Sequence, residues 1–366
     1  MKSSAAEDSN IREIREKVYS GTRLSDEEAL DLFRSNDLLS IGELADYVNR
    51  RKNGEKVYFV VNRHINPTNI CINKCQLCAF GRDESDSDAY LMSMSEVMSA
   101  AGAAASDGAT EVHIVGGLHP TLPFEFYLEI INRIKNEFPG LHIQAFTAVE
   151  IDYFSRISRR SIKDVFRALV DSGLGSLPGG GAEIFNSGVR NDICSKKISG
   201  ERWLEIMETA HNSGLRSNAT MLYGHIETLE DRIQHMSLLR DLQDRTGGFQ
   251  SFIPLAFHPE NTRINKKGLT TGVEDLKTLA LARVYLDNFK HIKAFWIMLG
   301  EKLSQISLNF GVNDLDGTVV EERITHSAGA QTGEFLPRNE LIRFIQSAGR
   351  IPVERDTLYN ELKIYS

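Results

Sequence analysis

The sequence has 366 residues, of which 41% are hydrophobic and 25% charged, so the chain can bury a large core and is not disordered overall. A formal net charge of −8 argues against a nucleic-acid partner, because phosphate binding needs an excess of lysine and arginine. No run approaches the roughly 18 apolar residues of a membrane span, and the first ten residues are too polar for a secretion signal. We therefore expect a cytoplasmic protein that acts on a small molecule.

The start of the chain has the pattern of amphipathic helices. Apolar residues recur at helical spacing from Ile11 to Val18, and Ser25 followed by Glu28 resembles a capping box. We expect residues 1–55 to form an N-terminal helical segment ahead of the main domain.

From Val57 onward, short apolar runs alternate with longer amphipathic segments that carry helix-start signals, such as the capping boxes at Ser93 and Thr228. The predicted strands are 57–62, 112–115, 141–146, 175–177, 216–222, 249–255 and 292–298, with a weaker eighth at 314–318. Alternating strands and helices indicate a parallel sheet, and eight units favour an α/β fold of the (β/α)8 TIM-barrel type over residues 56–320. The pattern does not decide whether the barrel closes.

The alternation weakens after about residue 300. Residues 336–355 have the pattern of a terminal helix followed by a proline-containing tail. We expect residues 321–366 to be a C-terminal extension that covers the barrel.

The strongest chemical signal is a cluster of three cysteines directly after the first predicted strand. Cys71, Cys75 and Cys78 are separated by three and then two residues, whereas Cys194 is far away and more typical of a packing residue. Structural zinc usually takes two close pairs of ligands, so a zinc-binding module without catalysis is the weaker alternative. Three thiolates can instead ligate three irons of a four-iron cubane and leave the fourth iron open to a ligand.

This motif resembles that of the radical S-adenosylmethionine superfamily. The resemblance implies a [4Fe-4S] cluster on Cys71, Cys75 and Cys78, whose open iron binds S-adenosylmethionine and whose electron releases a 5′-deoxyadenosyl radical. The residue before the third cysteine is often aromatic in that superfamily and is Leu77 here. Phe80 lies close by, and we take it as a cofactor-binding candidate.

Glycine-rich loops follow two of the predicted strands. Gly116 and Gly117 follow the second strand, where the superfamily binds the methionine amino group through backbone atoms that a side chain would block. A simple tight turn is the alternative. Glu183 follows the fourth strand, and the resemblance makes it a candidate for the ribose hydroxyls, with a structural ion pair as the alternative.

Further polar residues lie beside predicted strand ends and are candidates for binding substrate. An inward Asn218 would need a ligand or a partner, because an unpaired polar group inside a barrel is costly. An arginine guanidinium can form two hydrogen bonds to one carboxylate. The six candidates are Arg82, His119, Asn218, Tyr223, His258 and Arg263. Each alone is more often a surface or supporting residue.

Several longer stretches resemble one family within the superfamily, the aminodeoxyfutalosine synthases. The stretches are 64–69, 113–120, 145–151, 177–185, 217–227, 252–263 and 314–320, and the resemblance runs from about residue 11 to about residue 360. It implies addition of the adenosyl radical to 3-[(1-carboxyvinyl)oxy]benzoate, giving 6-amino-6-deoxyfutalosine on the route to menaquinone. It also implies an electron donor such as flavodoxin or ferredoxin.

Related radical enzymes are the alternatives within the superfamily. They include the dehypoxanthine futalosine cyclase of the same pathway and a deazaflavin-cofactor synthase, which share the cysteine motif and parts of the glycine loops. The stretches 146–151 and 177–183 favour the synthase.

Overall fold

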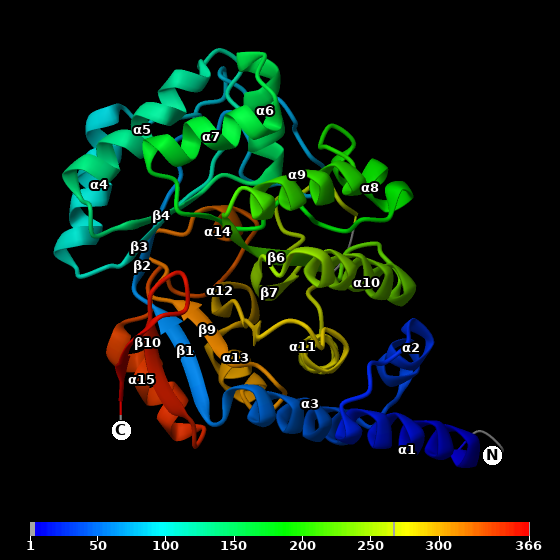
Figure 1. Cartoon of the computed structure of the whole chain (residues 1–366). Coiled ribbons are helices and arrows are strands. Elements are labelled where there is room, and N and C mark those ends of the chain that lie inside the picture. The colour runs from blue at the N-terminus through cyan, green and yellow to red at the C-terminus, as the bar shows by residue number, and fades with distance from the viewer. Residues whose placement is uncertain (1–3, 266–267, 366) are drawn as a thin grey trace.

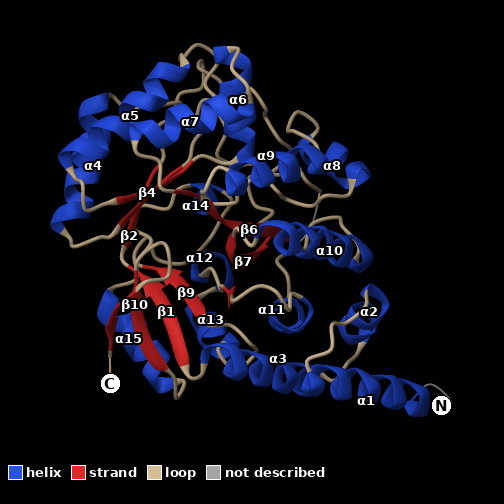
Figure 2. Ribbon diagram, in the orientation of Figure 1, coloured by secondary structure: helices blue, strands red, loops and turns tan. Residues whose placement is uncertain are grey.

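The computed structural model describes residues 4–265 and 268–365. Its centre is a sheet of seven parallel strands surrounded by helices (Figure 2). In spatial order the strands are β2 (Asn62–Ile65), β3 (Glu111–Ile114), β4 (His142–Ala145), β5 (Ser176–Leu177), β6 (Arg216–Tyr223), β7 (Phe249–Ala256) and β8 (His291–Ile292). Six of the seven, β3 to β8, overlap predicted strands, although β8 is much shorter than predicted, and β2 begins at the last residue of the predicted first strand, 57–62.

Two further strands close this sheet into a barrel. β1 (Lys56–Val60) leads directly into β2. β9 (Asp314–Gly317) pairs with β1 in parallel. On its other side β9 meets the end of β8, because Lys293 forms a parallel bridge with Asp314 and the Ala294 N–H donates to the Asp314 carbonyl at 2.9 Å. β9 therefore lies between β8 and β1, which confirms the TIM-type barrel and shows that it closes.

The outer layer consists of helices that connect successive strands (Figure 1). Ser93 and Thr228 cap their helices as predicted, each with a reciprocal capping box. The helices are α4 (Met94–Ser106), α5 (Phe124–Glu137), α6 (Ala148–Ser158), α7 (Ile162–Ser172), α8 (Ser187–Cys194), α9 (Gly200–Asn212), α10 (Leu229–Thr246) and α11 (Gly272–Tyr285). No helix in residues 4–265 or 268–365 is long and apolar enough to cross a membrane.

The predicted seventh strand, 292–298, is wrong beyond its first residue. β8 ends at Ile292, and Trp296–Leu299 forms the short helix α12. The Trp296 indole packs inside the protein and donates from Nε1 to the Gly317 carbonyl at 2.9 Å. A short apolar run reads the same in a buried strand and a buried helix, so periodicity could not separate them.

The C-terminal extension contacts both ends of the barrel. After α13 (Glu301–Ser307) and β9, the short helix α14 (Ile324–Ser327) contributes to the cavity at the carboxyl end of the strands. The chain then forms α15 (Arg338–Ser347), β10 (Ile351–Arg355) parallel to β1, and β11 (Glu361–Ile364). The tail thus supplies two strands that the sequence did not predict: β10 pairs with the distant β1, and β11 pairs antiparallel with β10.

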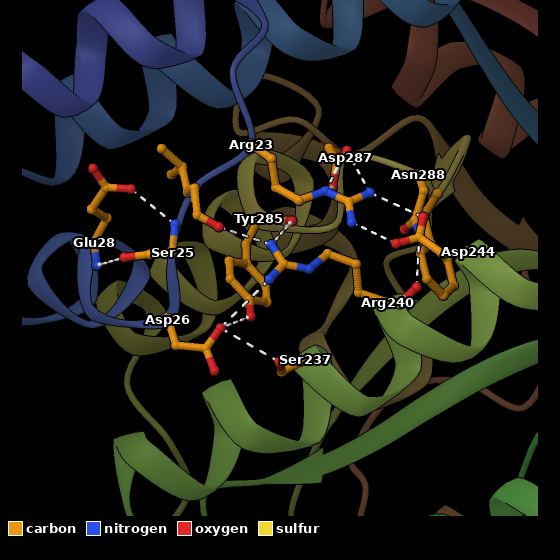
Figure 3. A network of polar contacts seen from close by, with 12 residues as sticks. Arg23, Ser25, Asp26, Glu28, Ser237, Arg240, Asp244, Tyr285, Asp287 and Asn288 are labelled. Carbon is orange, nitrogen blue, oxygen red and sulfur yellow. Dashed lines mark hydrogen bonds and ion pairs between the residues drawn. The ribbon is translucent and has the colours of Figure 1, made fainter.

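The N-terminal helices pack against the outside of the barrel. α1 (Ser4–Ser20) and α3 (Leu38–Asn53) lie along one side of the molecule, while α2 (Asp26–Arg34) contacts α10 and α11 (Figure 1). Ser25 and Glu28 form the predicted capping box. A polar network holds this junction, in which Arg23 pairs with Asp244 and Asp287 (Figure 3).

Candidate active site

A cavity of about 330 Å³ lies at the carboxyl ends of the barrel strands. Active sites of this barrel type lie at the same end, where loops from many strands converge. The residues that the sequence predicted for the site and that line this cavity are Cys71, Cys75, Cys78, Phe80, Gly116, Gly117, Glu183, Asn218 and His258.

The three cysteines lie on the loop between β2 and α4. Cys71 donates its N–H to the Arg82 carbonyl at 3.0 Å, and the Arg82 N–H returns to the Asn69 carbonyl at 2.8 Å, so the loop folds back on itself. A Cβ placed on Gly81 would lie 3.5 Å from the Cys71 Cβ and 3.9 Å from the Cys78 Sγ, so Gly81 lies between these two side chains. The loop therefore presents the thiols together at one wall of the cavity.

The donor set fits an iron–sulfur cluster. Burial raises the pKa of the Cys75 thiol to about 12, so a metal must displace its proton before the thiolate can bind. No three His, Cys, Asp or Glu side chains of the described ranges converge on a single ion. A cubane is wider than one ion and meets its thiols at separate corners, so thiols spaced around a cavity wall suit it.

The structure gives Gly116 and Gly117 a packing reason to be glycine, and the ligand contact that the sequence suggested stays a prediction. A Cβ on Gly117 would lie 2.2 Å from the Ile70 carbonyl oxygen, and one on Gly116 would lie 3.1 Å from the Thr68 oxygen. The Gly117 N–H also donates to Thr68 O at 2.8 Å. The two glycines thus let the cysteine loop pack onto the end of β3, while both still line the cavity.

Glu183 forms the ion pair that the sequence left open as an alternative. The Lys197 ammonium contacts its carboxylate. Burial raises the pKa of Glu183, but the charge and hydrogen bond of Lys197, together with the nearby Arg190 and His225, outweigh it and the net shift of the pKa is downward. Glu183 nevertheless lines the cavity, so it can meet a ligand with its charge already balanced. The residue has a left-handed backbone, with φ 50°, which is rare for a side chain other than glycine and typical of functional sites.

Two polar substrate candidates point into the cavity. Asn218, on β6, accepts a hydrogen bond from the Ser251 hydroxyl at 2.8 Å. Thr220 and Leu222 share its inward face, as strand alternation predicts. His258 follows β7 and donates from Nε2 to the Met298 carbonyl at 3.0 Å, which leaves Nδ1 as an acceptor.

The other four substrate candidates lie outside the cavity lining. Tyr223 follows the inward Leu222, so alternation turns it outward, and its hydroxyl donates to Asp275 of α11 at 2.8 Å. The His119 ring is buried and accepts at Nδ1 from the Thr121 N–H at 3.3 Å.

Arg82 and Arg263 line a separate surface depression with Cys78, on the outer side of the cysteine loop. Arg82 is held there by Asp88, at 2.8 Å. Neither arginine reaches the cavity that was expected to hold the substrate, because the loop itself lies between.

The sequence missed a buried carboxyl beside Gly116. Glu150 accepts from the Gly116 N–H at 3.2 Å and from the Thr147 N–H at 2.7 Å, and it lines the cavity. Burial raises the pKa of Glu150 to about 7, against the effect of these hydrogen bonds. The capping box of Thr147 and Glu150 was the available signal, but it marks a helix start and not a site.

Polar side chains at the barrel interior were also missed. His64, His113 and Gln144 are in register on β2, β3 and β4, and all three line the cavity together with Lys293 and Asp316. His64 and His113 open two of the stretches that resemble the synthase family, 64–69 and 113–120, but that resemblance did not single them out as site residues. Gln144 and Lys293 lie inside segments that the sequence assigned as strands.

Sequence comparisons define the class of this protein. The profile of the Radical SAM superfamily matches residues 65–239, and that of the CofH/MqnC C-terminal region matches residues 246–366. With the thiols placed at the carboxyl end of a closed barrel, these matches make the chain a radical S-adenosylmethionine protein.

Individual relatives narrow the class. The chain is 49% identical to an aminodeoxyfutalosine synthase from Thermus thermophilus over 98% of its own length and 97% of the relative's. It is 44% identical to an aminodeoxyfutalosine synthase from Streptomyces coelicolor, over 97% of this chain and 94% of that one. The chain therefore belongs to the aminodeoxyfutalosine synthase family.

Other relatives share the fold or the wider family. A 5-amino-6-(D-ribitylamino)uracil–L-tyrosine 4-hydroxyphenyl transferase from Methanopyrus kandleri is 44% identical over 85% of this chain and 86% of its own length. Among solved structures, methylornithine synthase (PylB) aligns with a TM-score of 0.73 at 17% identity, covering 93% of this chain and 97% of that one. The hydrogenase maturase HydG from Carboxydothermus hydrogenoformans aligns with a TM-score of 0.74 at 18% identity, over 96% and 81%.

Proposed function

We propose that this chain joins the 5′-deoxyadenosyl group of S-adenosylmethionine to 3-[(1-carboxyvinyl)oxy]benzoate. The products are 6-amino-6-deoxyfutalosine, methionine and the lost carboxyl group as bicarbonate or carbon dioxide, in menaquinone biosynthesis. The observation that carries the proposal is the 49% identity, over 98% of the chain, with a relative named for this synthesis.

Each group of cavity residues has a part in this proposal. Cys71, Cys75 and Cys78 ligate three irons of a [4Fe-4S] cluster. When bound, the cluster and S-adenosylmethionine together supply the 5′-deoxyadenosyl radical. Glu183 accepts from the ribose hydroxyls. The remaining proposed contacts are the backbone at Gly116 and Gly117 for the methionine end, Phe80 for the adenosyl group, and Asn218 and His258 for the substrate.

In this proposal, the apolar walls of the cavity protect the carbon-centred 5′-deoxyadenosyl radical. Apolar side chains from three segments line it, and they include Leu222, Ile253, Leu255, Phe257, Phe295 and Met298. α14 adds Ile324 to the same lining. Such walls exclude water and stray hydrogen-atom donors, which would quench the radical before it reaches the substrate double bond.

We propose that a flavodoxin or ferredoxin in the cytoplasm supplies the electron at the outer face of the cysteine loop. Cys78 lines both the cavity and the outer depression that holds Arg82 and Arg263. The cysteine loop thus separates the cluster site from the surface, which gives the electron a short path from a bound carrier to the cluster.

The fate of the adenosyl group tests the proposed reaction. Reduced, cluster-loaded protein receives S-adenosylmethionine labelled in the adenine together with 3-[(1-carboxyvinyl)oxy]benzoate. We expect the label in a larger, covalently joined product, with an equal amount of methionine. Label found only as free 5′-deoxyadenosine, with the ether unconsumed, would refute the synthase assignment.

The hydroxyphenyl transferases are the second candidate, because the chain is 44% identical to one of them. The same protein is therefore incubated with L-tyrosine and 5-amino-6-(D-ribitylamino)uracil in place of the ether. We expect no joined product from this pair. A product formed here, and not with the ether, would assign the chain to the transferase.

A further inference from the structure

Three polar side chains of the barrel interior, Lys293, Asp316 and His64, line the cavity, and we call this part of it the floor. The proposed function gives these residues no role so far. Lys293 directly follows β8, is buried, and donates from Nζ to Asp316 Oδ1 at 2.5 Å. Both residues line the cavity. Lysine carries three N–H donors, so Asp316 occupies only part of its capacity.

A chain of buried contacts fixes Lys293 in place. Asp316 has a left-handed backbone, with φ 64°, and its N–H donates to Asp314 Oδ1 at 2.6 Å. Asp314 Oδ2 accepts from the Arg355 guanidinium at 2.7 Å. Arg355 belongs to β10, so the C-terminal extension supports the floor of the cavity from below. Strained backbone that is held this firmly is typical of a functional site.

His64 adds an unpaired group to the same floor. The residue is only 7% exposed, and its Nε2 has no hydrogen-bond partner among the described residues. The ring stacks on His113, with centroids 4.4 Å apart. Burial lowers the pKa of His64, so the ring is neutral near pH 7 and can donate one N–H. Buried polar atoms without partners are costly, and this one belongs to a residue that lines the cavity, where a ligand can satisfy it.

Each lysine that lines the cavity pairs with one carboxylate, and the three lysines differ in position. Lys197 pairs with Glu183, and Lys74 pairs with Asp83 on the cysteine loop. No arginine of the described residues lines the cavity. Lys293 lies close enough to His64 for its charge to lower the pKa of that ring, so it is the lysine that serves the barrel floor.

The carboxylates near the floor are balanced by cations and do not leave it with a net negative charge. Asp316 and Glu322 are the carboxylates that line the cavity near His64. Glu322 accepts from His326 Nδ1 at 3.1 Å, and this hydrogen bond raises the pKa of His326 to about 9, so the ring is charged at neutral pH. Two cations thus balance two carboxylates, and the floor carries no excess negative charge to repel an anionic ligand.

We propose that Lys293, with the N–H of His64 beside it, binds the ring carboxylate of the substrate. The inference rests on the proposed function, which gives the substrate two carboxylates. His64 lies within β2, below the loop that carries the thiols, so the floor suits the group remote from the reacting double bond. The residues position the substrate and do not take part in bond making.

A neutral analogue tests the assignment by binding, without turnover. Calorimetry measures the affinity of cluster-loaded, unreduced protein with S-adenosylmethionine for 3-[(1-carboxyvinyl)oxy]benzoate and for the ring benzamide, 3-[(1-carboxyvinyl)oxy]benzamide. We expect the wild type to prefer the acid by about 10- to 100-fold, as charge-assisted hydrogen bonds do. Lys293→Gln should weaken acid binding by a similar factor and remove the preference.

Two further variants keep the test decisive. Lys293→Arg retains the charge and should retain a preference for the acid, even if Lys293→Gln misfolds. Lys302→Gln, on the exposed side of α13, should behave as the wild type. An unchanged acid preference in folded Lys293→Gln would overturn the carboxylate site alone. If the wild type binds neither compound, the proposed function falls with it.

Discussion

Two charged networks of the molecule differ in where their unpaired atoms lie. At the junction of the N-terminal helices, Arg23 is held by two carboxylates, and Arg240 donates to the Leu24 carbonyl at 3.0 Å (Figure 3). Arg240 Nε is buried without a partner among the described residues, and Arg240 does not line the cavity. At the cavity floor, Lys293 has a single carboxylate and His64 Nε2 has no partner among the described residues.

The difference separates structure from function. The junction pairs opposite charges from distant segments and holds α2 against α10 and α11. At the floor, Asp316, Asp314 and Arg355 hold Lys293 in place, and Lys293 and His64 line the cavity. Paired charges near the surface stabilise little, whereas an unpaired buried donor on a residue that lines a cavity can be satisfied by a ligand. Each prediction below alters one side of this comparison.

The largest effect is expected at the thiols. Changing Cys71, Cys75 or Cys78 to Ala should abolish the cluster and all cleavage of S-adenosylmethionine, because the remaining two thiolates cannot hold a cubane with one open iron. Iron, sulfide and methionine release measure this. Cys194→Ala is the matched control and should keep wild-type iron content. If Cys194→Ala alone lost the cluster, the ligand assignment would be wrong.

The next effect concerns the fit between Gly117 and the cysteine loop. Gly117→Ala places a Cβ 2.2 Å from the Ile70 carbonyl, so backbone must move, at a cost of about 3 kcal/mol. We expect lower iron content together with weaker S-adenosylmethionine binding. Gly140→Ala, where a Cβ meets nothing within 4 Å, should change neither. Normal iron content with impaired ligand binding would restore the explanation that the sequence suggested.

A smaller effect concerns the pH dependence that Glu150 imposes on stability. The pKa of Glu150 is raised by burial from 4.5 to about 7, so the folded state holds the proton more tightly than the unfolded state. Stability should therefore fall as pH rises through this window, by roughly 2 kcal/mol between pH 5 and pH 7. Denaturant unfolding of the protein and of Glu150→Gln, at both pH values, measures it. Equal slopes for the two proteins would contradict the raised pKa.

The smallest effect is expected at the N-terminal junction. Arg23 is about 40% exposed, so its ion pairs with Asp244 and Asp287 are screened by water. Arg23→Ala should cost at most about 1 kcal/mol of unfolding free energy and leave iron content and S-adenosylmethionine cleavage unchanged. A loss of cleavage in this variant would show that the junction is coupled to the cavity.

The sequence by itself determined the barrel and its chemical centre. The sequence indicated eight strand positions, the helix starts at Ser93 and Thr228, and the three cysteines. These features can be predicted because they depend on residues that are neighbours along the chain. The inward face of β6 was also predictable, because alternation fixes it once the strand is placed.

Only the tertiary structure decided which polar residues share the cavity. Arg82 and Arg263 lie close to the cysteine loop but on its outer side, and Tyr223 is turned outward by one position of strand alternation. Lys293 and His64 are 229 residues apart, and both line the cavity because β9 brings the first and last parts of the barrel together. Closure of the sheet, like the pairing of β10 with β1, depends on contacts between distant segments, and no local pattern records them.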